Sequence, residues 1–155
     1  MIDVLVAGGG PIGLAAALYC HRAGLTVRVL EQRSGPIDKA CGEGLLPPAL
    51  CALTELGVRP AGADITGIRY LDAKQSVDAS FRAGPGRGVR RTELHAALYT
   101  AVLGAGIVLE QRRVTEVGQD ERAVTVAGLR SRYLVAADGL HSPIRRQLGL
   151  DRPSR

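Results

Sequence analysis

The segment from Ile2 to Glu31 limits the possible folds of this 155-residue chain more than any other part of the sequence. Residues 2–7 form an apolar run broken only by Asp3, which is typical of a parallel strand buried on both faces. The stretch Gly8-Gly9-Gly10-Pro11-Ile12-Gly13 then predicts a tight turn into a helix that ends near Gly24. Residues 27–31 predict a second strand that ends in a carboxylate. The segment therefore predicts a βαβ unit of the kind that binds an adenine dinucleotide.

The residues of the glycine-rich turn have separate mechanical roles. Gly8 lets the chain turn sharply out of the strand, and Gly10 lets the backbone approach a diphosphate closely because it has no side chain. Gly13 is expected to let the helix pack tightly on the strand, while Pro11 suits a first helical turn, where its missing N–H would have no partner. Together with Ile12, these residues are predicted to present the N–H groups and positive dipole end of the helix to the phosphates.

Glu31 is the carboxylate at the tip of the second predicted strand. It can accept hydrogen bonds from both ribose hydroxyls of an adenosine, and its charge would repel a 2′-phosphate, which favours FAD or NAD over NADP. Gln32 and Arg33 follow it directly and are included in the predicted cofactor site. The alternative is an ordinary buried βαβ unit with a glycine turn, because a glycine pattern alone is a weak signal.

The composition argues against nucleic acid as a partner. The net charge is +5 and the isoelectric point about 9.6, but the arginines are scattered, and the chain has one Phe and no Trp to stack on bases. A positive field that favours an anionic cofactor is the preferred interpretation. No stretch is long and apolar enough to span a membrane, and the N-terminus lacks the basic start of a signal peptide, so a cytoplasmic protein is expected.

Neither the cysteines nor the histidines form a recognisable reactive set. Cys20, Cys41 and Cys51 have no zinc-ligand spacing and no Cys-x-x-Cys motif, so we expect inert thiols and no metal site. The three histidines form no nucleophile–base arrangement with a serine or cysteine. We therefore predict no catalytic side chain.

Downstream of the first unit, the sequence predicts a mixture of helices and strands. A helix is expected over residues 47–56, ended by Gly57, and another begins with Thr92 as its cap and ends at Gly104. Strands are predicted over residues 64–71, 76–81, 107–109, 114–117, 123–126 and 133–137, with a turn at residues 72–74 and a glycine-rich loop at residues 84–88. The strand over 107–109 is expected to be buried. This order predicts an α/β fold with a parallel sheet and antiparallel β insertions.

Two further motifs follow the glycine-rich turn. One is Arg91-Thr92-Glu93-Leu94 with Leu98, at the start of the second long helix, and the other is the run from Ala137-Asp138-Gly139 to Arg145 after the last predicted strand. With the turn and Glu31, they resemble the motifs of FAD-dependent monooxygenases of the aromatic hydroxylase type. They are also similar to those of the related geranylgeranyl reductases and flavin-dependent halogenases. The resemblance covers nearly the whole chain and implies a Rossmann-like FAD/NAD(P)-binding fold.

The resemblance implies FAD as the cofactor and NAD(P)H as a transient reductant. It implies that Arg91 offers a charged fork to a phosphate or ribitol oxygen, that Asp138 serves both FAD and the nicotinamide nucleotide, and that the backbone of Val114 meets the adenine. The alternative for Arg91 is a surface arginine, although a cation is unfavourable at a helix start. The alternative for Asp138 is a simple Asp-Gly turn before a cap at Ser142. The alternative for Val114 is an ordinary buried valine, which would have the same sequence pattern.

The activity that the resemblance implies is that of an NAD(P)H-dependent monooxygenase acting on a small aromatic or other hydrophobic substrate. The segment Cys41-Gly42-Glu43-Gly44-Leu45 instead resembles a loop of the reductase-like relatives, so reduction of a double bond stays open as an alternative. For this loop itself, direct contact with the flavin competes with a simple glycine crossover. In either activity the protein would position the cofactor and exclude water.

Members of the resembled family continue beyond the third motif into a substrate-binding sheet and a C-terminal helical region. We therefore expect residues 1–155 to be a truncated FAD-binding domain, in which residues 64–82 are a partial contribution to an incomplete substrate-domain sheet. A separate chain that supplies the C-terminal part is an expected partner, besides the small-molecule substrate. A non-catalytic dinucleotide-binding remnant is the alternative to an enzyme.

Overall fold

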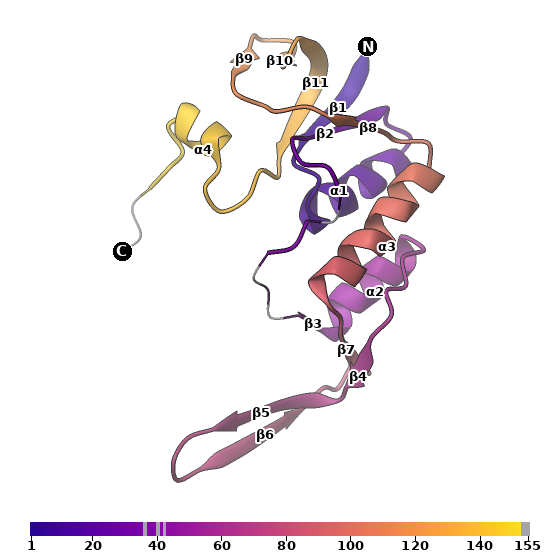
Figure 1. Ribbon diagram of the computed structural model, residues 1–155, viewed down its shortest axis with the longest axis vertical. Helices are drawn as coiled ribbons and strands as arrows, with labels where there is room; N and C mark the ends of the chain where they lie inside the picture. The colour runs from indigo at the N-terminus through magenta and orange to yellow at the C-terminus, as the bar shows by residue number, and fades with distance from the viewer. Residues whose placement is uncertain (36, 40, 42, 153–155) are drawn as a thin grey trace.

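A computed structural model of the protein describes residues 1–35, 37–39, 41 and 43–152. A six-stranded sheet forms the upper part of the molecule in the view of Figure 1. Its strands, in spatial order, are β8 (Val108–Gln111), β2 (Val27–Glu31), β1 (Ile2–Ala7), β11 (Leu129–Ala136), β10 (Val124–Val126) and β9 (Val117–Gln119). The first four run parallel, and β10 and β9 are added antiparallel at the other edge. The predicted parallel sheet with antiparallel insertions is confirmed.

The predicted βαβ unit is formed by β1, α1 (Pro11–Arg22) and β2. Pro11 occupies the first turn of α1, where a proline removes no helical hydrogen bond. Strands β1 and β2 pair in parallel from Val4 opposite Val27 to Ala7 opposite Leu30. Their carboxyl ends therefore lie at one edge of the sheet, together with the glycine-rich turn.

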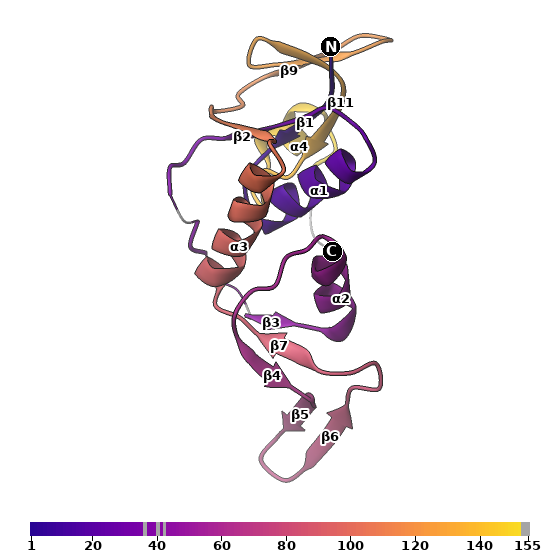
Figure 2. The same ribbon diagram turned by 90° about the vertical axis from the view of Figure 1, so that its right-hand side faces the viewer.

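Two apolar cores cover the two faces of the sheet, because successive side chains of β1 point to opposite sides. On one face, Val4 and Val6 pack against α1, α2 (Pro47–Glu55) and α3 (Arg91–Gly104). On the other face, Leu5 packs with residues of β9, β10 and α4 (Pro143–Gln147). Figure 2 shows α1 and α3 side by side over the first face. These cores fix the elements that carry the candidate site.

The two strands predicted over residues 64–71 and 76–81 form a different arrangement from the expected one. The first is split into β4 (Ala63–Ile65) and β5 (Gly67–Leu71), which belong to different sheets. Among the described strands, β5 pairs with β6 (Ser76–Ser80) alone, across a turn in which the Asp72 carboxylate accepts the N–H groups of Lys74 and Gln75. At the switch point, Gly67 lies so close to the carbonyl of Ala79 that a side chain would not fit. The prediction of one continuous strand was therefore wrong.

The glycine-rich loop predicted over residues 84–88 is in part a strand. β7 (Gly86–Gly88) is the central strand of a three-stranded antiparallel sheet between β3 (Gly44–Leu45) and β4. A Cβ on Gly86 would lie 2.5 Å from the carbonyl oxygen of Leu45, so the close pairing needs a glycine. Gly86, one of the glycines that indicated a loop, is therefore what allows this strand to be central.

The strand predicted over residues 107–109 is β8, but it is not fully buried, contrary to the expectation. Within the part of the chain that the structure describes, β8 is at the edge of the sheet and pairs with β2 alone, so Val108 is exposed and Leu109 half-buried. The predicted hairpin of residues 114–126 is present as β9 and β10, although β9 begins only at Val117. Cys20 is half-buried against the first core, and the other cysteines are exposed; all three are free.

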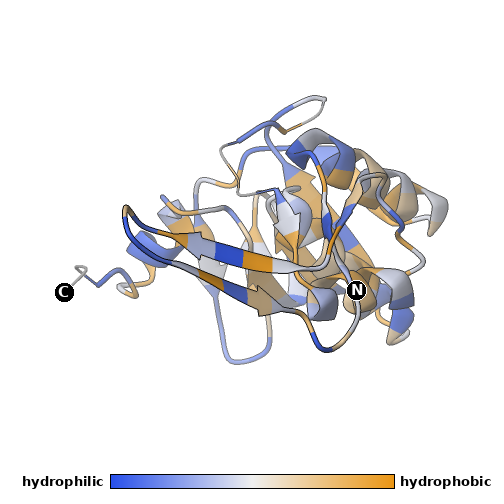
Figure 3. Ribbon diagram, turned by 90° about the horizontal axis from the view of Figure 1, so that it is seen from below, coloured by the Kyte–Doolittle hydropathy of each residue, from blue (hydrophilic) through white to orange (hydrophobic). Residues whose placement is uncertain are grey.

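The hairpin of β5 and β6 projects from the end of the molecule opposite the six-stranded sheet (Figure 1). Viewed from below, it shows apolar and polar residues along both strands (Figure 3). Its exposed apolar side chains include Ile68, Tyr70, Leu71 and Val77. Within the described part of the chain, no helix combines the length and apolar character needed to cross a membrane.

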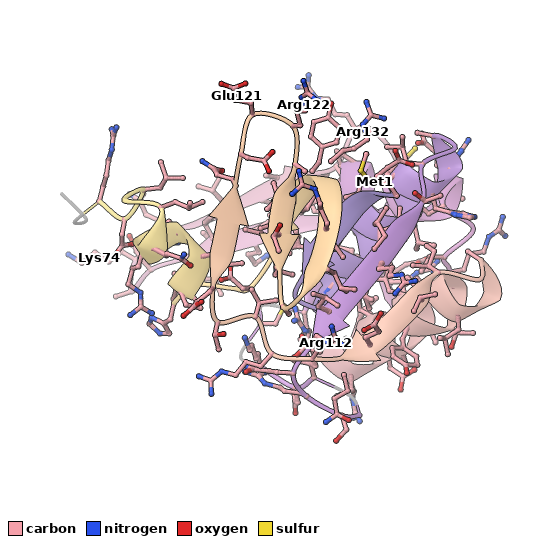
Figure 4. All side chains as sticks on the ribbon, turned by 90° about the horizontal axis from the view of Figure 1, so that it is seen from above. Met1, Lys74, Arg112, Glu121, Arg122 and Arg132 are labelled. Carbon is pink, nitrogen blue, oxygen red and sulfur yellow. The ribbon has the colours of Figure 1, made fainter. Side chains whose placement is uncertain are left out.

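Asp3 closes a polar network at the amino ends of the parallel strands. Its Oδ2 accepts the N–H of Thr26 at 3.0 Å and the Thr26 hydroxyl at 2.7 Å, and its Oδ1 accepts from Arg132 at 3.2 Å. Figure 4 shows Arg132 beside Met1 at this edge of the sheet. The bonds to Thr26, and then the bond to Arg132, lower the pKa of Asp3 from 3.8 to about 2.

The low pKa of Asp3 predicts a loss of stability in acid. Because the folded-state pKa lies below the ordinary value, the carboxylate contributes stability above about pH 4 that is lost as the pH falls towards 2. In urea titrations between pH 5 and pH 2, Asp3→Asn should show a smaller fall in the free energy of unfolding than the unsubstituted chain. Equal slopes for the two proteins would contradict this role of Asp3.

Candidate cofactor site

Gly8 directly follows β1 and lies against the residue that follows β11. Its φ is +111°, and a Cβ there would overlap the carbonyl of Ala137. The N–H of Gly8 donates to the carbonyl of Leu30 in β2 at 2.8 Å. The N–H of Ala137 donates to the carbonyl of Ala7 in β1, also at 2.8 Å. The turn is thus fixed to both neighbouring strands, and only glycine fits at its first position.

Gly13 sets the distance between α1 and the turn. A Cβ on Gly13 would overlap the carbonyl oxygen of Gly8 and would also crowd the Ala137 side chain. This is the close helix packing that the sequence predicts for the third glycine.

The first turn of α1 has free donors. The first helical bond in this turn is from Leu14 N–H to the Gly10 carbonyl, at 2.9 Å. The N–H groups of Gly10, Ile12 and Gly13 have no hydrogen-bond partner within the described residues, and Pro11 has no N–H. Ile12 itself is 77% exposed. These donors and the helix dipole suit an anion at this position.

Glu31 lies beside the turn and already holds it. Its Oε2 accepts the N–H of Gly9 at 2.7 Å, and its Oε1 accepts the N–H of Arg33 at 3.0 Å. Each carboxylate oxygen has lone pairs left for a further donor. Gln32 and Arg33 are exposed directly after β2.

Arg91 is the first residue of α3, and its side chain reaches the glycine turn. Its Nη2 lies 3.7 Å from the position that a Cβ on Gly10 would take. The Nε of Arg91 is buried and has no hydrogen-bond partner among the described residues. Since a buried donor without a partner costs about 1–3 kcal/mol, this geometry is better suited to a bound acceptor than to the protein alone.

The N-terminus of α3 is capped by a residue from a distant segment. The predicted cap at Thr92 is wrong, because the N-cap residue is Arg90, which has no side-chain capping bond. Instead, Glu43 Oε1 accepts the N–H of Arg91 at 3.0 Å, and the Glu43 carbonyl accepts the N–H of Val89 at 2.7 Å. The Glu43 carboxylate thus offsets the unfavourable position of a cation at a helix start. Of the segment 41–45, Gly42 lies outside the described residues.

Asp138 lies against the glycine turn from the other side. A Cβ on Gly8 would be 3.1 Å from the N of Asp138. Asp138 Oδ2 accepts the N–H of Ile144 at 3.2 Å, and the Ser142 hydroxyl accepts the N–H of Arg145 at 2.9 Å. The expected turn with a cap at Ser142 is therefore present, and Oδ1 of Asp138 makes no hydrogen bond within the described part of the chain.

Val114 lies in the connection from β8 to β9 and is half-buried against the second core. The connection begins beside the predicted ribose acceptor, since Arg112 N–H donates to the Glu31 carbonyl at 2.9 Å. In Figure 4, Arg112 lies at the edge of the sheet opposite Met1. The structure thus brings the predicted site residues to one edge of the sheet, with Val114 at its margin.

One residue of the site was not predicted. His95 on α3 is buried, and its Nε2 lies 3.0 Å from the carbonyl oxygen of Gly9. Helical spacing places it on the same face as the buried Leu98 and Val102, which would have indicated an inward position.

A hollow of about 590 Å³ lined by Met1, among others, lies at the amino edge of the sheet and is not part of this site.

Comparison with known families and proteins agrees with the geometry. Residues 1–155 match the family described as FAD binding domain. The chain is 34% identical to a menaquinone reductase of Mycobacterium tuberculosis, over 95% of this chain and 40% of that protein. It is 29% identical to a para-nitrophenol 4-monooxygenase of a Pseudomonas species, over 95% of this chain and 42% of that protein. The chain thus spans about two fifths of the length of these relatives.

Solved structures share the fold. A flavoprotein/dehydrogenase from Cytophaga hutchinsonii matches with a TM-score of 0.84 and 25% identity, covering 99% of this chain and 43% of that one. The anhydrotetracycline hydroxylase OxyS from Streptomyces rimosus matches with a TM-score of 0.83 and 27% identity, covering 99% of this chain and 35% of that one.

Proposed function

This chain belongs to the FAD binding domain family, and from that premise we propose that it is the FAD-binding part of an NAD(P)H-dependent flavin monooxygenase. The proposed substrate is a small aromatic or other hydrophobic molecule. Relatives and structural neighbours named as monooxygenases and hydroxylases support the class of reaction. The observation that carries the cofactor assignment within this chain is Arg91, which reaches the glycine turn with Nη2 and has a buried Nε without a hydrogen-bond partner among the described residues.

The diphosphate of FAD is proposed to bind at the N-terminus of α1. The N–H groups of Gly10, Ile12 and Gly13, which have no partner within the described residues, would donate to it, and the missing side chain of Gly10 would leave room for its approach. Arg91 would bring a positive charge and a donor fork to a phosphate or ribitol oxygen.

The adenosine is proposed to extend from the diphosphate towards β2. Glu31 would accept the ribose hydroxyls with its remaining lone pairs, and its charge would disfavour a 2′-phosphate at this position. Gln32 and Arg33 would flank the ribose, and the backbone near Val114 would meet the adenine.

Asp138 is proposed to act at the other end of the cofactor. Its Oδ1 would accept a ribityl hydroxyl while Oδ2 keeps the bond to α4, so the structural and binding roles are compatible. Bound FAD would supply the redox chemistry, taking up electrons from NAD(P)H and then reacting with oxygen. The side chains described here would bind and orient it, and none of them is proposed to be a catalytic acid or base.

Residues 64–82 are proposed to belong to a substrate-binding sheet rather than to the cofactor domain. The hairpin of β5 and β6 has no other strand beside it in the described residues, and Tyr70 and Leu71 are 63% and 72% exposed. Exposed apolar side chains of this kind suit a surface that other strands or a hydrophobic substrate would cover.

Reduction of a double bond in a hydrophobic substrate is the second candidate function. The name of the menaquinone reductase relative favours it, as does the resemblance of residues 41–45 to a loop of reductase-like flavoproteins. The two candidates share the same cofactor and reductant. They differ in whether oxygen is consumed together with NAD(P)H.

Cofactor titration and a turnover assay test the proposal in sequence. The purified chain should take up FAD, seen as a shifted flavin absorption spectrum, and should bind FMN much more weakly because FMN lacks the adenosine and the second phosphate. A folded chain that takes up no FAD would contradict the proposed cofactor site. For the protein of which this chain is proposed to be the FAD-binding part, NAD(P)H oxidation with oxygen uptake on adding an aromatic substrate would support the monooxygenase. Oxidation without oxygen uptake would support the reductase.

A further inference from the structure

The carbonyl group of Gly9 is held by a side chain that the proposed function does not use. His95 is 4% exposed, and its Nε2 lies 3.0 Å from the Gly9 oxygen. Because a carbonyl oxygen only accepts hydrogen bonds, the Nε2 atom of His95 carries the proton in this contact. The bond connects α3 with the centre of the glycine turn, across 86 residues of sequence.

This bond fixes the direction of the neighbouring N–H group. In a trans peptide unit, the C=O of Gly9 and the N–H of Gly10 point in opposite directions. When the oxygen of Gly9 points inward to His95, the N–H of Gly10 therefore points away from His95. That N–H has no partner in the described part of the chain and is one of the donors proposed for the diphosphate.

The peptide unit on the other side of Gly9 is fixed as well. The Gly9 N–H donates to Glu31 Oε2 at 2.7 Å, so side chains from β2 and α3 hold the two sides of this glycine. His95 is itself kept in place by Tyr99, one helical turn later, whose ring stacks on it with centroids 6.0 Å apart. A glycine has many accessible backbone conformations, so such restraints have a large effect on where its donors point.

We propose that His95 is a positioning residue for the cofactor diphosphate: its bond to Gly9 orients the Gly10 N–H before FAD arrives. Without this bond, the peptide unit between Gly9 and Gly10 can rotate, and part of the binding free energy is then spent on ordering the turn. The inference rests on the proposed function, since it assigns a role within the same cofactor site.

The test compares two amides of different reach at the same position. In His95→Gln the amide nitrogen can reach the place of Nε2, whereas in His95→Asn it ends one bond short. Val102→Ala is the matched control, because Val102 is fully buried on the same helix, seven residues after His95. The readouts are the Kd for FAD, the Kd for ADP, which has only the adenosine diphosphate, and the amide chemical shift of Gly10 in the FAD-free protein.

We expect His95→Asn to weaken FAD and ADP binding about tenfold and to move the Gly10 amide shift. His95→Gln should stay within about twofold of the unsubstituted chain, and Val102→Ala should lower the melting temperature without changing either Kd. Unchanged ADP affinity in His95→Asn, or an equal loss in Val102→Ala, would overturn the inference. If the unsubstituted folded chain binds no FAD, the proposed function fails, and the Gly10 shift still decides whether His95 orients the turn.

Discussion

Gly13→Ala is expected to lower the free energy of unfolding by about 3 kcal/mol and to remove measurable FAD binding. The added methyl group would overlap the carbonyl oxygen of Gly8 and crowd Ala137, both of which belong to strand ends held by other hydrogen bonds. Neither neighbour is the flexible end of a side chain, so α1 would have to move away from β1. The helix N-terminus would move with it, away from the position proposed for the diphosphate.

The matched control for this substitution is Gly104→Ala. Gly104 is also a helical glycine, at the end of α3, but a Cβ there would meet no atom within 4 Å. Alanine is the better helix former by up to about 1 kcal/mol, so this variant should be as stable as the parent chain or more stable. Thermal unfolding and FAD titration measure both variants. Equal melting temperatures for the two substitutions would show that the helix packing at Gly13 is not as close as described.

Arg91→Met is expected to weaken FAD binding about a hundredfold without lowering stability. Charge-assisted hydrogen bonds to phosphate or ribitol oxygens would be lost, and no bond within the described protein depends on the Nε atom. Because the substitution also removes a buried donor without a partner, the melting temperature of the FAD-free protein should stay constant or rise. The capping bond from Arg91 N–H to Glu43 belongs to the backbone and should persist.

Arg90→Met provides the control for charge. Arg90 is the adjacent residue and is exposed, so its loss changes the net charge equally but removes no side chain from the turn. Its FAD affinity should stay within about twofold of the parent at physiological ionic strength. Similar losses in both variants would mean that Arg91 acts through the overall field rather than by contact with the cofactor.

Several features of this protein follow from local sequence alone. The order of β1, turn, α1 and β2, the need for glycine at positions 8 and 13, and the place of Glu31 at the strand end were all predictable. They are encoded within a short segment by residues whose backbone preferences allow few alternatives. The parallel sheet followed from the same pattern, because buried parallel strands are short and apolar.

The tertiary structure decided the features that depend on contacts between distant segments. Glu43 caps α3 across 48 residues, and His95 holds Gly9 across 86 residues, without any local motif that announces either contact. The segment of β7 was predicted to be a loop because glycine favours turns. It forms a strand because β3 and β4, which are distant in sequence, pair with it on both sides. Local propensity thus determined the cofactor-binding turn. The tertiary packing of α3, and of the segment before β3 that caps it, added the hold on the turn that no local motif predicted.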